Sequence, residues 1–170
     1  MKTYKKGFTL IELLIVIALL GALAVGLLAA LDPFEQLKKG NDTGVRNTVS
    51  ELHGAAVRYY SIKNQLPWGT TDVGPVDVST GFSTDFNIQA VIDSGELKSD
   101  FSALAGGQLA NITMMGSSEA VTVCFKPASK AFRSDPNTKY DTSFSDTGTN
   151  DVANCGSPSA ATFSCYWCVR

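Results

Sequence analysis

Histidine is almost absent from this chain of 170 residues, which contains only His53. No Ser/His/Asp or Cys/His pattern surrounds it, and the chain has no glycine-rich loop of the kind that cradles nucleotide phosphates. A single histidine in the middle of a helical pattern, without obvious ligand partners, is typical of a surface or boundary position. We therefore expect a protein that is not an enzyme.

Charged residues are also scarce, at 18%, whereas hydrophobic residues make up 44%. This balance excludes a disordered, highly charged chain and leaves enough apolar material for a core. The formal net charge is −2, and without the three lysines of residues 1–7 the balance is 11 basic against 16 acidic residues. Such a chain lacks the broad positive field that favours binding to nucleic acid.

One small basic cluster is nevertheless present, and it consists of Lys126, Lys130, Arg133 and Lys139. A solvated, salt-bridged surface is the simpler interpretation of this cluster. Contact with DNA or with another anionic surface is the alternative.

Charge is missing altogether from Leu13 to Leu31, a run of nineteen residues. At about 1.5 Å per residue, a helix of this length roughly crosses a hydrocarbon layer of about 30 Å. The preceding segment, MKTYKKG, contains three lysines and no acid, which predicts a cytoplasmic N-terminus and places the rest of the chain across the membrane. The segment is compatible with a cleaved secretory signal, a plain membrane anchor or a prepilin-type leader. A plain anchor does not explain Glu12.

The string KKGFTLIELLIVIALLGALA, residues 5–24, resembles the N-terminal signature of type IV pilins and type II secretion pseudopilins. The resemblance implies cleavage by a prepilin peptidase between Gly7 and Phe8, followed by N-methylation of Phe8. It also implies that Glu12 pairs with the new amino group of a neighbouring subunit. The partners it implies are further copies of the chain, the prepilin peptidase, an inner-membrane assembly platform, and membrane lipid before assembly.

Glu12 also stands out on physical grounds, because an ionised side chain inside a bilayer costs about 2.5–3.5 kcal/mol on insertion scales. Two opposite charges that neutralise one another in lipid are more easily tolerated, which gives the pairing a physical reason. The alternative is that Glu12 lies near the membrane interface and extends its carboxylate to water.

The chain divides into a leader (residues 1–7), a membrane-spanning or filament-core helix (8–31), an amphipathic continuation of the helix (32–65) and a globular head (66–170). The junction Asp32-Pro33-Phe34-Glu35 reads as a capping box with proline at the first helical position, so we expect the helix to restart there with a kink at Pro33. The apolar residues of the continuation recur at spacings of three and four, which predicts a single stripe facing a core. They are Phe34, Leu37, Val45, Val49, Leu52, Ala56, Val57 and Tyr60.

In the head, the pattern predicts a connector (70–87), a short helix (87–98) and strands at 110–115 and 120–125. Residues 131–133 are a candidate third strand, residues 134–162 a polar loop, and residues 163–170 a last strand. A helix followed by a run of antiparallel strands indicates an α+β fold, in which the long N-terminal helix packs on a small sheet. Pilins and major pseudopilins have the same order of elements.

The four cysteines are Cys124, Cys155, Cys165 and Cys168. All of them follow the membrane segment, on the oxidising side, so disulfides are expected, and three pairings are possible. A zinc site formed by all four is an alternative, although their spacing does not match the common zinc ribbons. A separate candidate lies in the polar loop, where Asp146, Thr149 and Asp151 present oxygen ligands that suit calcium.

These observations predict a structural subunit of a type IV pilus-like filament, anchored by one membrane pass and then exported to a surface pilus. A pseudopilin that forms a cell-envelope rod for type II secretion or DNA uptake is the first alternative. A membrane-anchored adhesion or binding domain that does not polymerise is an alternative of another class.

Overall fold

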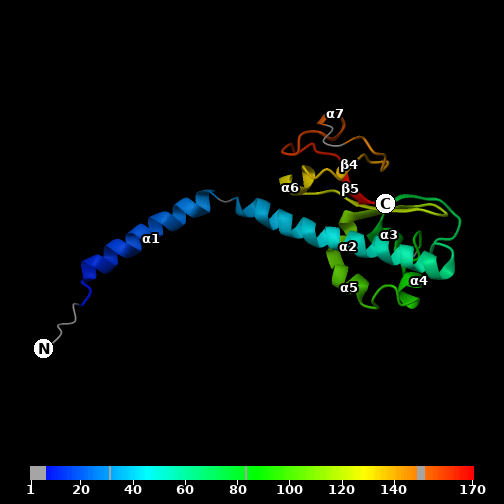
Figure 1. The fold of residues 1–170 in the computed structure, drawn as a ribbon, viewed down its shortest axis with the longest axis horizontal. Helices are drawn as coiled ribbons and strands as arrows, with labels where there is room; N and C mark the ends of the chain where they lie inside the picture. Colours follow the sequence, from blue (N-terminus) through cyan, green and yellow to red (C-terminus); the bar gives the residue numbers. More distant parts are fainter. Residues whose placement is uncertain (1–6, 31, 83, 149–151) are drawn as a thin grey trace. The chain divides into compact units, whose positions relative to one another are not determined.

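The computed structural model describes residues 7–30, 32–82, 84–148 and 152–170. Contacts divide the chain into two compact units, Met1–Gln36 and Leu37–Arg170, and we call the second the C-terminal unit. Two long helices, α1 (Leu10–Ala30) and α2 (Pro33–Lys63), precede all the strands (Figure 1). The expected helix order is therefore confirmed, and the fold is α+β.

In the C-terminal unit, α2 packs on a five-stranded antiparallel sheet. The strands of this sheet lie in the spatial order β1-β2-β3-β5-β4. Its strands are β1 (Val73–Asp77), β2 (Ile112–Gly116), β3 (Val121–Phe125), β4 (Thr138–Tyr140) and β5 (Tyr166–Val169). The last strand enters between β3 and β4, with Cys168 opposite Cys124 and Trp167 opposite Thr138. The edge strands β1 and β4 thus come from segments far apart in the sequence.

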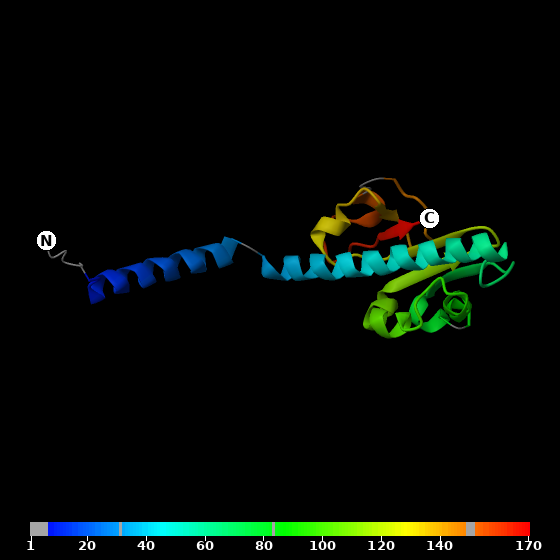
Figure 2. The ribbon, with the colours of Figure 1, turned by 60° about the horizontal axis from the view of Figure 1, so that its bottom comes forward.

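Short helices fill the connections between strands. Between β1 and β2 lie α3 (Val78–Gly81), α4 (Ile88–Asp93), α5 (Phe101–Ala105) and the 3-10 helix η1 (Gly106–Asn111). Helix α6 (Lys130–Arg133) follows β3, and α7 (Val152–Cys155) precedes β5. Within the C-terminal unit, α4 and α5 lie on one side of α2, and α6 and α7 on the other, in both ribbon views (Figure 2).

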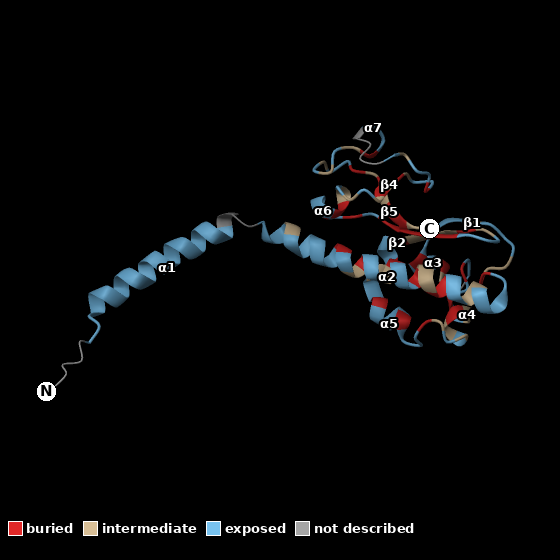
Figure 3. Cartoon of the chain, viewed as in Figure 1, coloured by how far each residue is buried: buried red, intermediate tan, exposed pale blue. Residues whose placement is uncertain are grey.

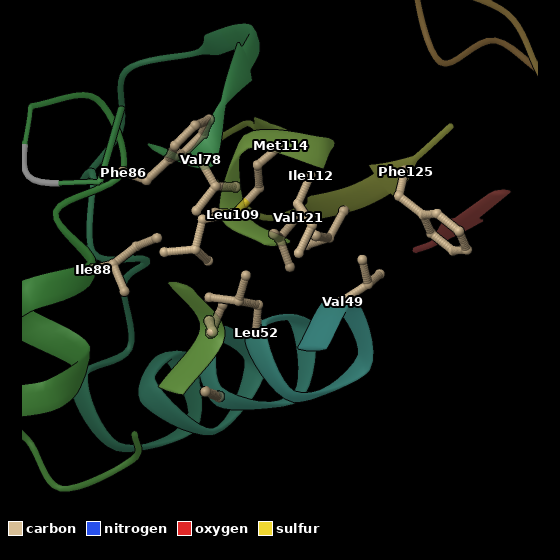
Figure 4. Close-up of a cluster of buried hydrophobic side chains, with 14 of the residues drawn as sticks. Val49, Leu52, Val78, Phe86, Ile88, Leu109, Ile112, Met114, Val121 and Phe125 are labelled. Carbon is tan, nitrogen blue, oxygen red and sulfur yellow. The ribbon is translucent and has the colours of Figure 1, made fainter. Parts of the chain in front are cut away.

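The core lies between one face of α2 and the sheet. Val49 and Leu52 of α2 point toward Ile112 and Val121 of the sheet, and the short helices close the core around them (Figure 4). Burying each side chain of this size stabilises the fold by about 1.5–3 kcal/mol before entropy is counted. Burial alternates along β2, which lies next to the edge strand β1. Every residue of β3, the central strand, is buried.

Trp68 anchors the loop after α2 against the β2–β3 turn. Its indole Nε1 donates a hydrogen bond to the carbonyl oxygen of Ser117, at 2.8 Å, and its ring packs edge-on against Phe86. A Cβ at Gly116 would lie 2.4 Å from Trp68 Cζ2, so only glycine fits beneath the ring.

Several expectations about the head are wrong. Residues 131–133 form part of α6 rather than a strand, because Ser129 caps this turn by accepting a hydrogen bond from the Phe132 N–H. The connector 70–87 contains β1 and α3, and the polar loop 134–162 contains β4 and α7. The short helix expected at 87–98 ends at Asp93.

The core stripe of α2 is also shorter than predicted. Phe34 and Leu37 are exposed, at 73% and 71%, and Val57 is exposed at 44%. The first buried positions of α2 are Asp42 and Val45, so the buried stripe begins well after the start of the helix (Figure 3).

Candidate functional site

The residues after the lysine-rich segment form a closed hydrogen-bonding unit at the start of α1. Glu12 Oε2 accepts hydrogen bonds from the Thr9 N–H, at 2.8 Å, and from Thr9 Oγ1, at 2.7 Å. In return, the Glu12 N–H donates to Thr9 Oγ1 at 3.3 Å. This is a capping box, which satisfies amide groups that the first turn of a helix leaves without partners. Sequence reasoning missed it, although Thr9 stands three residues before Glu12.

Gly7 and Phe8 lie directly before this box and outside the helix. Phe8 is 84% exposed, and nothing lies within 4 Å of the position that a Cβ on Gly7 would occupy. No described residue covers the Gly7–Phe8 peptide bond. Residues 1–6 of the leader lie outside the described residues.

The rest of α1 is an apolar surface on all sides. Every described side chain from Leu10 to Leu28 is exposed, and this stretch is long and apolar enough to cross a membrane. Nothing lies within 4 Å of the Cβ positions of Gly21 and Gly26. A surface of this kind requires either lipid or other apolar helices around it.

The junction between the helices has the predicted capping pattern. Helix α1 ends at Ala30, α2 begins at Pro33, and Leu31 lies outside the described residues. Asp32 Oδ1 accepts a hydrogen bond from the Glu35 N–H at 3.3 Å, as expected of an N-cap residue. The restart of the helix is confirmed, and a kink at Pro33 stays a prediction.

A second carboxylate on the helices, Asp42, ties α2 to the segment between β3 and α6. It is buried, at 3% exposure, and its oxygens accept hydrogen bonds from the N–H groups of Ala128 and Ser129 and from Ser129 Oγ. The distances to the Ser129 atoms are 2.8 Å and 2.7 Å. Nothing in the sequence links residue 42 to a segment more than 80 positions later, so this contact was missed.

All four cysteines form disulfides, Cys124–Cys168 and Cys155–Cys165. The first joins the adjacent strands β3 and β5, and the second closes a small cluster around Phe163. The pairing follows from strand register, which the sequence left open. It also leaves no cysteine thiolate to bind zinc.

The predicted calcium site consists of Asp146, Thr149 and Asp151, of which the structure describes only Asp146. Asp146 is described, and its carboxylate binds Lys139 Nζ at 2.6 Å and the Gly148 N–H at 2.9 Å. The hydrogen bond with Lys139 lowers the pKa of Asp146, and the same bond raises the pKa of Lys139. Thr149 and Asp151 lie outside the described residues, and the described part of the chain contains no group of three potential metal ligands. Calcium binding stays a prediction.

The basic cluster of residues 126–139 is partly engaged within the fold. Arg133 donates to the carbonyl oxygens of Pro127 and Ala160, both at 3.0 Å, and Lys139 forms the ion pair with Asp146. Lys126 and Lys130 are exposed.

His53 has the predicted boundary position, since it is partly buried on α2. It lines an open hollow of about 630 Å³ together with Val57, Tyr60 and Met115. Burial lowers the pKa of its imidazole, which favours the neutral ring.

Comparison with known proteins identifies the N-terminal segment. Residues 2–28 match the prokaryotic N-terminal methylation motif, which is the signature of type IV pilins and pseudopilins. No curated protein and no solved structure matches the chain. The match covers Gly7, Phe8, Thr9 and Glu12, together with the apolar surface of α1 up to Leu28.

Proposed function

We propose that this chain is a structural subunit of a type IV pilus-like filament that polymerises through α1. The observation that carries the proposal is an apolar helix exposed on every side, within a prokaryotic N-terminal methylation motif. The motif supports a pilin-like or pseudopilin protein in general. The role that we propose is structural rather than catalytic.

Processing is the first step of the proposed function. A prepilin peptidase would hydrolyse the bond between Gly7 and Phe8 and then methylate the new amino group of Phe8. Removal of residues 1–7 takes away three lysines, which leaves a helix start with a free amine and the Glu12 carboxylate. Cleavage thus creates a positive charge close to a negative one in the same apolar segment.

Assembly would then bring the Phe8 amine of one copy to the Glu12 carboxylate of another. Within one copy, Glu12 already accepts hydrogen bonds from Thr9 through Oε2, and the neighbour's amine would add the opposite charge. Neutralisation makes both charges less costly in an apolar environment, so a correctly staggered neighbour is favoured over an isolated subunit.

The apolar helix and the motif fit a membrane-anchored protein with an extracytoplasmic C-terminal unit. We propose that α1 resides in the inner membrane with its N-terminus in the cytoplasm, and that an assembly platform there transfers the subunit to a surface pilus. A periplasmic rod for secretion or DNA uptake is the second candidate, because pseudopilins carry the same methylation motif.

Electron microscopy of cells with and without this gene tests the proposal directly. Surface fibres that contain the protein support the pilus, and short envelope rods support the pseudopilin. If the protein stays anchored in the membrane and is found in neither fibres nor rods, both the pilus and the pseudopilin proposals are contradicted. That result favours a membrane-anchored adhesion or binding domain that does not polymerise.

Mass spectrometry of the mature protein tests processing. We expect an N-terminus at methylated Phe8, and we expect Gly7→Trp to block the cut, because the peptidase must accommodate the residue before the scissile bond. Gly107→Trp, a matched change at an exposed glycine of η1 with nothing within 4 Å of its Cβ position, should leave cleavage intact. A mature protein that retains Met1, or one cut beyond Ala24, would contradict the proposed cleavage.

A further inference from the structure

A second hollow, different from the one that His53 lines, lies beside the edge strand β1, and we call it the Trp68 hollow. Its volume is about 630 Å³, within the range of about 300–1,000 Å³ that small-molecule pockets span. Its walls come from the loop after α2, from β1 and from the segment before α4. The side chains that could stack on a ligand or form hydrogen bonds with it belong to Trp68, Thr71, Asp72, Thr84, Asp85 and Asn87.

Trp68 is held in a fixed position at the wall of this hollow. Its indole Nε1 donates to the Ser117 carbonyl oxygen, its ring packs edge-on against Phe86, and the absence of a side chain at Gly116 makes room for it. The residue is nevertheless partly exposed, and it lines the hollow. A fixed aromatic ring is a preorganised surface for the apolar face of a ligand, since little side-chain freedom is lost on binding.

The two carboxylates of the hollow are not neutralised by ion pairs within the described part of the chain. Residues 64–97 include no lysine or arginine, and neither Asp72 nor Asp85 forms an ion pair with a described residue. The side chain of Asp72 also has no hydrogen-bond partner among these residues, and that of Asp85 accepts one hydrogen bond, from Thr84 at 2.9 Å. Both aspartates are exposed, so acceptor oxygens remain free at the hollow.

Amide and hydroxyl groups complete the polar lining. Asn87 donates through Nδ2 to the Pro67 carbonyl oxygen at 3.4 Å, which leaves its Oδ1 without a partner among the described residues. Thr71 and Thr84 contribute hydroxyl groups, which can both donate and accept hydrogen bonds. The hollow therefore combines one fixed aromatic ring with charged acceptors, a neutral acceptor and hydroxyl groups.

We propose that the Trp68 hollow binds the ring of a neutral sugar. A sugar ring has an apolar face of C–H groups, which suits a fixed indole, and an edge of hydroxyl groups, which donate and accept hydrogen bonds. Hydrogen bonds to a carboxylate are about twice as strong as neutral ones, so Asp72 and Asp85 select among the hydroxyl groups. The proposal goes beyond the filament role and does not depend on it, because the hollow belongs to the C-terminal unit alone.

An organic cation suits the hollow less well. Sites for quaternary ammonium groups enclose the charge in a cage of aromatic rings, whereas Trp68 is the one aromatic residue among the described residues that line this hollow. Asp72 and Asp85 are exposed, so water and salt screen their attraction for a free charge. The hydroxyl groups of the two threonines are also partners that a sugar uses and a quaternary ammonium group does not.

Nuclear magnetic resonance of the full chain tests the proposal, because its only two tryptophans are Trp68 and the buried Trp167. The detergent should have neither a sugar nor an ammonium headgroup, and the probes are the methyl glycosides of glucose, galactose, mannose and N-acetylglucosamine. We expect at least one probe to shift the indole N–H signal of Trp68 saturably in the millimolar range and to leave that of Trp167 unchanged. If none of the four shifts the Trp68 signal at about 50 mM, the proposal is overturned.

Alanine variants test whether the carboxylates of the hollow take part, and they avoid replacing Trp68, which also anchors the fold. Asp72→Ala combined with Asp85→Ala should weaken the binding roughly tenfold, because charged hydrogen-bond acceptors are lost. The matched control, Asp93→Ala with Asp100→Ala, makes the same change in net charge at exposed acids outside the hollow and should bind like the wild type. Equal affinities of the two double variants would overturn the proposal.

Tetramethylammonium chloride distinguishes a sugar site from a cation site. We expect it neither to shift the Trp68 signal nor to displace a bound glycoside. A shift caused by tetramethylammonium in place of the glycosides would identify a cation site, and the proposal would then be wrong.

Discussion

Helix α1 is apolar on all sides and the middle of α2 has one apolar face, but only the apolar face of α2 packs against other parts of the chain. Val49 and Ala55 of α2 are completely buried against the sheet, whereas the described side chains of α1 from Leu10 to Leu28 are all exposed. The fold of the C-terminal unit is therefore stabilised by its own core. Stabilisation of α1 has to come from lipid or from other apolar helices around it.

The carboxylates of the two regions show the same contrast. Asp42 is buried, and four hydrogen bonds from its own chain occupy its oxygens. Glu12 is exposed, its side chain accepts hydrogen bonds from Thr9, and residues 7–30 include no lysine or arginine. A buried carboxylate without a counter-charge is tolerated when hydrogen bonds satisfy it, whereas one that enters an apolar environment with few hydrogen bonds needs a cation. The carboxylate of Asp42 has the hydrogen bonds it needs within one copy of the chain, whereas that of Glu12 accepts hydrogen bonds only from Thr9 among the described residues and has no nearby cation.

The strongest test of this contrast replaces Glu12. We expect Glu12→Leu to be inserted and cleaved, since the cut lies at the Gly7–Phe8 bond, but to lose nearly all filament assembly because the neighbour's amine then has no counter-charge. Insertion should improve slightly, because an intramembrane charge costs about 2.5–3.5 kcal/mol. The readouts are the mass of the mature protein and the amount of sheared filament.

Two further variants separate charge pairing from helix capping. Glu12→Gln keeps an oxygen that can accept the Thr9 hydrogen bonds, and Thr9→Val keeps the charge but weakens the capping box. If pairing is the role of Glu12, the glutamine variant should fail to assemble and the valine variant should assemble. The opposite pattern would make Glu12 a capping residue, and a Glu12→Leu variant that is not cleaved would place its role in peptidase recognition.

Removal of the disulfides tests how far the C-terminal unit depends on its own cross-links. The Cys124–Cys168 bond closes a loop with a sequence separation of 44, and the Cys155–Cys165 bond one of 10. The chain-entropy model gives about 4 kcal/mol of stabilisation for the first and about 2.7 kcal/mol for the second.

We therefore expect Cys124→Ala/Cys168→Ala to lower the free energy of unfolding by more than Cys155→Ala/Cys165→Ala. Urea unfolding in detergent, followed by tryptophan fluorescence, measures this directly, because both tryptophans, Trp68 and Trp167, lie in the C-terminal unit. The reverse order would mean that the smaller loop carries native contacts that its length does not predict.

The sequence predicted the elements whose patterns are long or strongly alternating. The apolar run gave α1, the spacing of three and four gave α2, and the clusters at 110–115 and 120–125 correspond to β2 and β3. The stretch Ala131-Phe132-Arg133 is too short to show whether its hydrophobic pattern is that of a strand or of a helix. It forms a helical turn, because Ser129 caps it. Strand β1 was missed because it contains Pro75, which an edge strand tolerates.

At the candidate site, prediction was limited to residues that are close in sequence. The methylation motif is contiguous, so Gly7, Phe8 and Glu12 could be selected from it. The disulfide pairing depends on β5 entering beside β3, and a local pattern does not contain that information. The same limit applies to Asp42, whose partners lie 86 and 87 residues later in the chain.

Asp42 provides the next test, with a smaller expected effect than the Cys124–Cys168 bond. Asp42→Ala leaves the buried N–H and hydroxyl groups of Ser129, and the N–H of Ala128, without their acceptor, which should lower the free energy of unfolding by about 2–3 kcal/mol. Asp42→Asn keeps one acceptor oxygen and should cost less. Hydrogen exchange at these two amides should accelerate in the alanine variant, and an unchanged rate would mean that Asp42 does not hold this segment.

The smallest expected effect is the pH dependence due to His53. Burial lowers the pKa of this imidazole in the folded state, so the unfolded chain binds the proton more tightly. The resulting stability is fully present above the unfolded pKa, near 6.5 for an ordinary histidine, and is lost as the pH falls from there toward the lower folded value.

Since His53 is the only histidine, the decrease in unfolding midpoint between pH 7.5 and pH 5.5 should be smaller in His53→Gln. The charged groups that line the same hollow as His53 are Asp72, Glu119 and Arg170. An equal decrease in the glutamine variant would show that another group, such as the amine of processed Phe8, produces the pH dependence.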